Sequence, residues 1–152
     1  MKTNEILNLI RDIRTSPPPK KGRGDFDPKL HDKYNHLIEA LRKHGKLETI
    51  IWEELGSFVF KREFSSVLIH KGYHCLREYL AKRKDLPKPW MKKLAKDDNT
   101  FVVAGLAGNP SLDEDTVDLL LESENYWVHE NIANNLSISQ NARNHAWDYY
   151  YR

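Results

Sequence analysis

Two histidines and the single cysteine come nearest to a metal-ligand spacing. His70 and His74 lie four residues apart with Cys75 beside the second, and on a helix the two imidazoles would face the same side. Gly72 lies between them, and no fourth ligand follows nearby. Because a zinc site needs three or four protein ligands, we interpret these residues as structural or surface residues and predict no metal site.

Another histidine begins a pattern that is found in zinc proteases. His129 and Glu130 match its first two positions, but Ala133 stands where the second histidine ligand is required. The acidic residues are abundant, yet they are not arranged as a recognisable catalytic pair. The sequence therefore predicts a protein with no catalytic residue, no cofactor and no enzyme activity.

Acidic residues are concentrated toward the C-terminal end of the chain. Residues 97–152 contain 10 Asp and Glu against 2 Lys and Arg, whereas residues 1–96 contain 12 against 22. An acidic surface attracts basic protein and repels nucleic acid. The carboxylates expected to contact a protein partner are those of Asp113, Glu114, Asp115, Asp118, Glu122 and Glu124. Carboxylates in the first turn of a helix also stabilise its dipole, which is an alternative role for several of them.

Aromatic residues in the same part of the sequence fit two roles. Tyrosine and tryptophan are preferred anchors of protein interfaces, and the candidates are Tyr126, Trp127, Tyr149 and Tyr150. The three consecutive tyrosines at 149–151 cannot all face inward on a helix, so some of them either cover the end of the fold or contact a partner. We expect at least one of Tyr126 and Trp127 to be buried.

A lysine-rich stretch supports an alternative function. Seven basic residues, Lys96 included, cluster around one predicted helix–turn–helix junction. The six candidate contacts are Lys82, Arg83, Lys84, Lys88, Lys92 and Lys93. Such a cluster, with Trp90 among it, would follow the phosphates of a nucleic acid backbone. The alternative interpretation is therefore a nucleic-acid-binding module made of helical repeats.

The elements that hold these residues are predicted to be helices of one domain, because 152 residues are enough for a single core. Apolar spacing predicts an N-terminal helix over residues 1–14, and the prolines and glycines of residues 15–28 predict an extended connector. Residues 29–59 predict a helical hairpin in which Gly45 ends the first helix. No apolar run approaches the roughly 20 residues that span a bilayer, so we expect a cytoplasmic protein without membrane contact.

Packing alone must hold this fold, because one cysteine excludes a disulfide within the chain. The second helix of the hairpin is predicted to bury Leu47, Ile50, Ile51 and Leu55. Trp52 and Trp90 lie in apolar stripes of helices and are predicted to belong to the core.

A repeat of about 26 residues runs through residues 60–152. Sliding the sequence against itself by 26 positions superposes Leu86 on Leu112 and Ile138, Val102 on Val128, and Asn109 on Asn135. Each unit is predicted to consist of two short helices joined by a tight turn. The buried stripe is predicted to contain the pairs Leu76/Leu80, Val102/Leu106 and Val128/Ile132.

Candidate helix caps fall at fixed positions of this repeat. Asp85, Ser111 and Ser137 precede the first helix of successive units, and we predict them as its N-caps. Asn99 and Asn125 are predicted to cap the second helix. Because cap chemistry depends on position, these residues support the repeat independently of hydrophobicity.

The segment LAKDDNTFVVAGLAGNPSLDEDTVDLLLES resembles the leucine-rich repeat variant family. The matching residues are Asp98, Val102, Leu106, Ala107, Asn109, Pro110, Leu112 and Leu120. The resemblance implies a right-handed all-α solenoid, related in design to HEAT and armadillo arrays. The cysteine-rich segment of that family is missing here, so no iron–sulfur role is carried over.

Together these observations favour an all-α fold, a short right-handed α-solenoid of helix pairs behind an N-terminal helical segment. A rigid array with separated charges is suited to binding a protein partner. Stated most concretely, the sequence suggests a bacterial immunity protein or antitoxin that neutralises a cognate basic nuclease toxin through its acidic repeats.

Overall fold

The computed structural model describes residues 2–16, 28–60 and 74–152, with the side chains of His74 and Cys75 excepted. All regular structure in these residues is α-helical and they contain no strand, which confirms the predicted all-α fold. The chain divides into two compact units, Met1–Leu76 and Arg77–Arg152, and each is described by itself. Most of the predicted connector, together with His70, lies outside the described residues.

Three helices build the first unit: α1 (Thr3–Thr15), α2 (Pro28–His44) and α3 (Thr49–Val59). α1 packs against both α2 and α3, and it does so with Ile6, Ile10 and Ile13, which share one helix face and are fully buried. Gly45 follows α2 with a φ of 82°. This left-handed conformation favours glycine and ends the helix as predicted.

α3 ends where the predicted hairpin ends and departs from its sequence pattern at Ile50. It continues through Gly56 to Val59, because Phe58 and Val59 are buried and Phe58 meets the Tyr34 ring of α2 edge-on, with ring centroids 6.4 Å apart. This packing outweighs the low helix propensity of glycine. Ile50, predicted to be buried, is 48% exposed, since the buried face follows every fourth residue from Leu47. Trp52 is buried as predicted.

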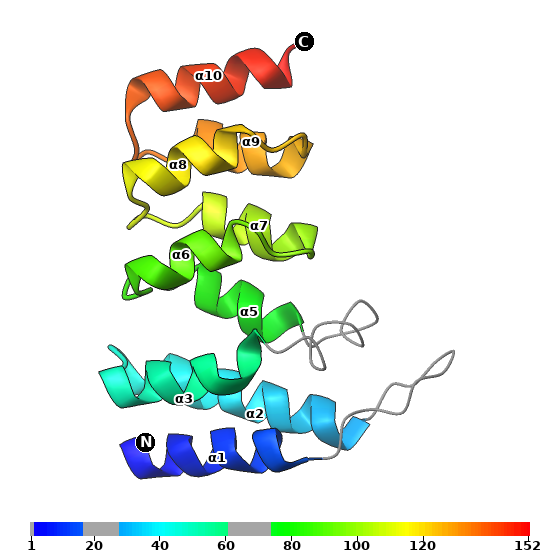
Figure 1. Ribbon diagram of the computed structural model, residues 1–152, viewed down its shortest axis with the longest axis vertical. Helices are drawn as coiled ribbons and strands as arrows, with labels where there is room; N and C mark the ends of the chain where they lie inside the picture. The colour runs from blue at the N-terminus through cyan, green and yellow to red at the C-terminus, as the bar shows by residue number, and fades with distance from the viewer. Residues whose placement is uncertain (1, 17–27, 61–73) are drawn as a thin grey trace. The chain divides into compact units, whose positions relative to one another are not determined.

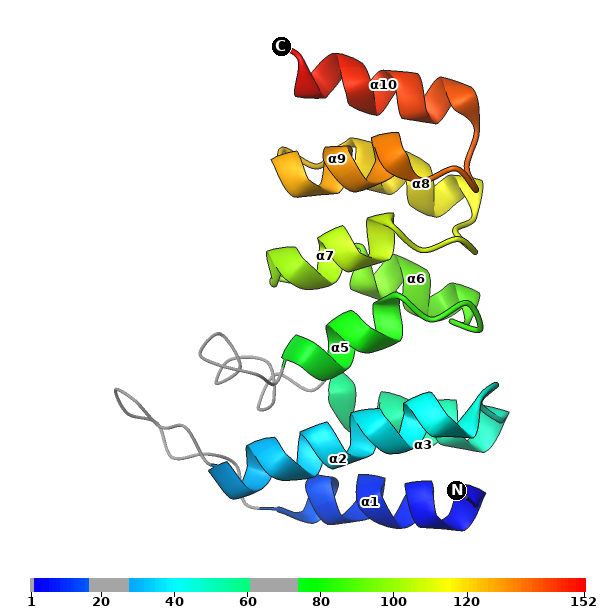
Figure 2. The same ribbon diagram turned by 180° about the vertical axis from the view of Figure 1, so that it is seen from behind.

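Short helices that start at regular intervals build the second unit. They are α5 (His74–Ala81), which crosses the boundary between the units, α6 (Lys88–Leu94), α7 (Thr100–Ala107), α8 (Glu114–Leu121), α9 (Tyr126–Asn134) and α10 (Gln140–Tyr150). The starts of α6, α8 and α10 are 26 residues apart, as are those of α7 and α9. Figures 1 and 2 show α6 and α8 on one side of this unit and α7 and α9 on the other. α10 packs against both α8 and α9.

The predicted inner stripe of this unit is buried. Its members are fully buried: Leu80, Val102, Leu106, Val128 and Ile132. Leu76, the last residue of the first unit and the predicted partner of Leu80, is 1% exposed. Burying one such side chain stabilises the fold by about 1.5–3 kcal/mol. Trp90 of α6 is also buried as predicted.

One buried position of the repeat is polar in α5 and α9, whereas its equivalent in α7 is Val103. Arg77 of α5 donates two hydrogen bonds to the Asp97 carboxylate, of 2.8 and 3.3 Å, and both side chains are less than 10% exposed. Two repeats later, at the equivalent positions, the buried His129 ring stacks on the Tyr149 ring with 3.8 Å between centroids. The same pair of positions thus holds an ion pair in one layer and stacked rings in another.

Asparagine caps the helices on the α7 side, as predicted. The Asn99 side chain accepts hydrogen bonds from the backbone N–H groups of Phe101 and Val102, and Asn125 accepts one from Trp127. These bonds satisfy N–H groups that have no partner within a helix.

The predicted caps of the other series are wrong by two residues. α8 is capped by Asp113, whose carboxylate accepts the N–H of Thr116 at 2.8 Å, and α10 is capped by Ser139. α6 begins after Pro87, an N-cap without a side-chain bond. The predicted caps were Asp85, Ser111 and Ser137, and each of these residues lies two positions earlier in the turn.

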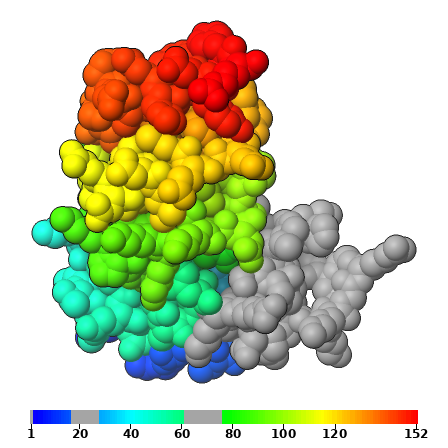
Figure 3. All heavy atoms as spheres, turned by 45° about the horizontal axis from the view of Figure 1, so that its top comes forward, coloured from blue at the N-terminus to red at the C-terminus, as the bar shows by residue number. Residues whose placement is uncertain are grey.

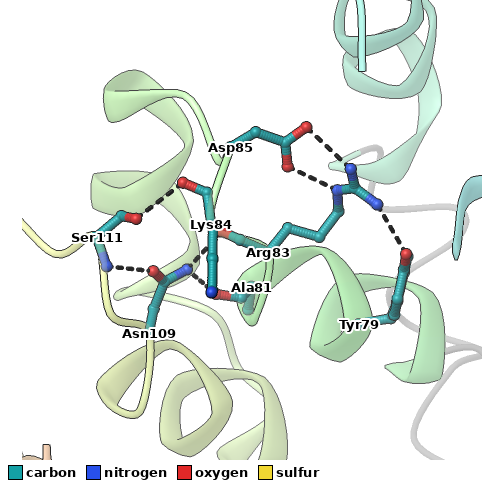
Figure 4. A network of polar contacts seen from close by, with 7 residues as sticks. All are labelled: Tyr79, Ala81, Arg83, Lys84, Asp85, Asn109 and Ser111. Carbon is teal, nitrogen blue, oxygen red and sulfur yellow. Dashed lines mark hydrogen bonds and ion pairs between the residues drawn. The ribbon is translucent and has the colours of Figure 1, made fainter. Parts of the chain in front are cut away.

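A buried asparagine amide explains this shift. The Asn109 side-chain nitrogen donates to the carbonyls of Ala81 and Arg83, at 2.6 and 2.8 Å, while its oxygen accepts the N–H of Ser111 at 2.8 Å (Figure 4). The Ser111 hydroxyl donates to the Lys84 carbonyl at 2.8 Å, so this serine holds two turns together and does not cap a helix.

Asn135 repeats this arrangement one layer later. Its side-chain nitrogen donates to the carbonyls of Ala107 and Asn109, at 3.0 and 2.9 Å, and its oxygen accepts the N–H of Ser137 at 3.1 Å. Both asparagines are buried. Each turn is therefore tied to two carbonyls that lie 26 and 28 residues earlier.

Replacing Asn135 with alanine is expected to lower the free energy of unfolding by about 2 kcal/mol or more, because three backbone groups of a buried turn lose their partner. The exposed neighbour Asn134, whose amide bonds only the Glu130 carbonyl, provides the matched control. Asn134→Ala should change the free energy by less than about 0.5 kcal/mol. Urea denaturation followed by circular dichroism measures both, and equal losses would contradict the role given to Asn135.

Replacing Asp113 with alanine is expected to lower the free energy of unfolding by about 1 kcal/mol at neutral pH, since the N-cap of α8 is lost. The hydrogen bond from Thr116 holds the pKa of the Asp113 carboxyl below its usual value. Its stabilisation is therefore complete above the pKa of an unfolded aspartate and is lost as pH falls through the lower folded pKa. Denaturation curves should converge in acid for wild type and Asp113→Ala, whereas a constant difference down to acid pH would exclude an ionised cap.

Candidate functional site

One side of α8 presents three carboxylates to solvent. Glu114, Asp118 and Glu122 are spaced four residues apart, so they lie in line on one helix face. All three are exposed, whereas Leu120 on the opposite face is buried. Among the described residues, none of the three carboxylates forms an ion pair or a hydrogen bond. We call Glu114, Asp118 and Glu122 the carboxylate stripe.

The carboxylate stripe lines a groove between α8 and α10. The groove has a volume of about 520 Å³, and its α10 side is formed by Asn141, Ala142 and His145. Apolar side chains also line it: Leu112, Val117, Leu121 and Ile138. Figure 3 shows the surface of α8, in yellow, directly beside that of α10, in orange-red to red. Lysine and arginine combine an apolar stem with a charged head, so the lining of this α8–α10 groove matches basic side chains.

The other acidic candidates have different surroundings. Asp113 caps α8, and Asp115 forms an ion pair with Lys92 of α6 at 3.5 Å. Glu124 is exposed in the turn before α9, where its backbone carbonyl accepts the Tyr149 hydroxyl at 2.8 Å. The structure therefore gathers three of the six predicted carboxylates at one groove.

Tyr126 and Trp127 are both exposed, by 44% and 55%. The expectation that at least one of them is buried is wrong, because Val128 and His129 occupy the inward positions at the start of α9. The Tyr126 hydroxyl donates to that of Tyr150 at 2.6 Å. This hydrogen bond is the main cause that raises the pKa of Tyr126 to about 12.

The C-terminal tyrosines divide between two environments. Tyr149 stacks on the buried His129 and Tyr150 pairs with Tyr126, so both help to cover α9. Tyr151 is 75% exposed and stacks on Trp147 with 5.2 Å between centroids. An anchoring role for the four predicted aromatic residues stays a prediction.

The basic candidates have different surroundings. Arg83 donates two hydrogen bonds to Asp85, at 2.7 and 2.9 Å, and a third to the Tyr79 hydroxyl at 2.8 Å (Figure 4). Burial opposes its charged form, but these hydrogen bonds outweigh it and raise the pKa of Arg83. Lys82 pairs with Glu78 on α5. The remaining candidates lie in the turn after α5 or on α6: Lys84, Lys88, Lys92 and Lys93.

Sequence reasoning missed the α10 wall of the groove. Asn141 and His145 stand one repeat after Asp115 and Leu119, so the 26-residue register contained the signal. It also missed a second groove of about 360 Å³, lined by Phe101 and Trp127 together with small residues of α7 such as Gly105. Phe101 is 61% exposed, and it stands one repeat before Trp127.

The described part of the chain contains no group of three or more His, Cys, Asp or Glu placed to hold a metal ion. His70 and the side chains of His74 and Cys75 lie outside it. None of the helices described is long and apolar enough to cross a membrane.

Comparison of the chain with protein-family models, with curated proteins and with solved structures found no match.

Proposed function

We propose that this protein is a non-catalytic, cytoplasmic binding module that holds a basic protein through the α8–α10 groove. The observation that carries the proposal is the carboxylate stripe, whose three exposed side chains have no ionic or hydrogen-bonded partner among the described residues. From Glu114 to the C-cap Glu122 the stripe covers eight residue steps, about 12 Å at the rise of an α-helix. That length suits several basic side chains of one partner.

The architecture that we propose for the second unit is a short right-handed α-solenoid of 26-residue helix pairs, similar to leucine-rich repeat variant proteins. Its support is the common interval between helix starts and the repeated bonds of Asn109 and Asn135. A solenoid presents a preformed surface, so little conformational freedom is lost when a partner binds.

In its most concrete form, the proposal is a bacterial immunity protein or antitoxin that neutralises a basic nuclease toxin. A nuclease site attracts phosphates with lysine and arginine. A line of carboxylates on a rigid helix would compete with the nucleic acid for these groups. The alternative, nucleic-acid binding by the lysine-rich segment, has weaker support because Lys82 and Arg83 are held in ion pairs.

The test is a combined variant, Glu114→Lys, Asp118→Lys and Glu122→Lys. The wild-type protein, immobilised, is expected to capture a basic protein with nuclease activity from its host and to inhibit that activity stoichiometrically. The variant should bind the same protein about 100-fold more weakly or worse, because attraction is replaced by repulsion. Calorimetric titration of the purified pair measures the dissociation constants.

A matched control carries the same change of charge elsewhere: Asp32→Lys, Glu53→Lys and Asp98→Lys, all at exposed positions. It should bind as the wild type does. Equal binding by all three proteins, or an equal loss in both variants, would overturn the assignment to the groove. Capture of nucleic acid that a salt wash releases would instead favour the lysine-rich segment.

A further inference from the structure

The α6 side of the second unit carries a second line of charge. Lys88, Lys92 and Lys96 are spaced four residues apart and all are exposed. We call them the lysine stripe. Each stands 26 residues before a member of the carboxylate stripe. Lys88 and Lys92 lie on α6 and Lys96 lies in the turn after it, whereas Glu114 and Asp118 lie on α8 and Glu122 is its C-cap. The helices α6 and α8 are neighbours on one side of the unit (Figure 1).

The two stripes do not neutralise each other within the chain. Lys92 of α6 pairs with Asp115 of α8 at 3.5 Å and not with the carboxylate stripe. Both partners remain exposed, by 60% and 79% of their side chains. The carboxylate stripe lines the groove between α8 and α10, and Glu122 also lines a pocket with Ala95 and Asp98. The lysine stripe and the carboxylate stripe therefore lie beside each other with the same residue spacing. Their exposed side chains can still form ion pairs with another molecule.

This pattern is complementary to itself. A twofold axis parallel to the helices can be placed outside the unit, in front of α6 and α8 and midway between them. Rotation about this axis would place α6 of one copy opposite α8 of the other. Such an axis keeps the helix direction, so residues 26 positions apart meet at the same height. The opposed pairs would be Lys88 with Glu114, Lys92 with Asp118, and Lys96 with Glu122, each formed twice.

We propose that a second copy of this chain docks on this face, forming a symmetric dimer in which each lysine stripe meets the carboxylate stripe of the other copy. The inference does not rest on the proposed function, since it needs no other partner. Both use the carboxylate stripe, so dimerisation and capture of a basic protein exclude each other. Dissociation of the dimer would then precede partner binding.

The proposed dimer contact consists of ion pairs, so its stability depends on ionic strength. Exposed ion pairs are individually weak and are screened by salt, so the dimer is expected to form at high protein concentration and low ionic strength. Raising the salt from about 0.01 M to about 1 M shortens the screening length from about 30 Å to about 3 Å. The dimer should dissociate over this range.

Two charge-reversed chains test the pairing. The first carries Lys88→Glu, Lys92→Glu and Lys96→Glu, and presents two acidic stripes. The second carries Glu114→Lys, Asp118→Lys and Glu122→Lys, and presents two basic stripes. Sedimentation equilibrium of the full chain at low salt is expected to show a dimer for the wild type and a monomer for each variant alone.

An equimolar mixture of the two variants should form a heterodimer, because two acidic stripes then face two basic ones. A chain with all six substitutions should again form a homodimer. Circular dichroism of every chain checks that folding is unchanged. A wild type that stays monomeric at low salt, or a mixture that gives no heterodimer, would overturn the proposal.

The lysine variant separates this inference from the proposed function. It loses the dimer and keeps the carboxylate stripe, so it should capture the basic protein at least as well as the wild type. Failure of the proposed function would leave the dimer unchanged and no basic protein captured. Failure of the dimer would leave a monomer whose capture still depends on Glu114, Asp118 and Glu122.

Discussion

The second unit depends on a side-chain amide that reaches back from one turn to the preceding one. Backbone groups in a buried turn have no water to bond and need partners within the protein. One asparagine amide supplies two donors and an acceptor, and Asn109 and Asn135 use all three on backbone groups. Because the bonded carbonyls lie at fixed distances along the chain, the following helix must begin at a fixed point. The alignment of α6, α8 and α10 follows from this constraint.

That alignment lets exposed side chains vary freely in charge. Equivalent outward positions hold lysines on α6 and carboxylates on α8, while α10 has Gln140 and Asn144 at the first two of them. The buried positions between them stay mostly apolar and hold the layers together. Backbone register therefore decides where charges meet a partner, and side-chain identity decides which partner fits.

The sequence predicted the features that depend on local spacing. Periodic apolar residues located the inner stripe, and Asn99 and Asn125 cap helices as expected because each cap acts within its own turn. The starts of α8 and α10 were misplaced because the N–H groups of Ser111 and Ser137 bond to asparagines, a contact decided by the preceding layer. The groove at Asn141 and His145 was not predicted for a similar reason, since it forms only when two helices lie side by side.

The asparagine contacts also govern how such a chain tolerates changes of length. An additional helix pair of 26 residues, inserted between two turns, leaves every amide with carbonyls 26 and 28 positions before it. Deletion of a single residue from α8 moves Asn135 away from both of its acceptors at once. The length of this unit is therefore expected to vary by whole repeats of 26 residues, whereas a surface loop accepts insertions of one or a few residues.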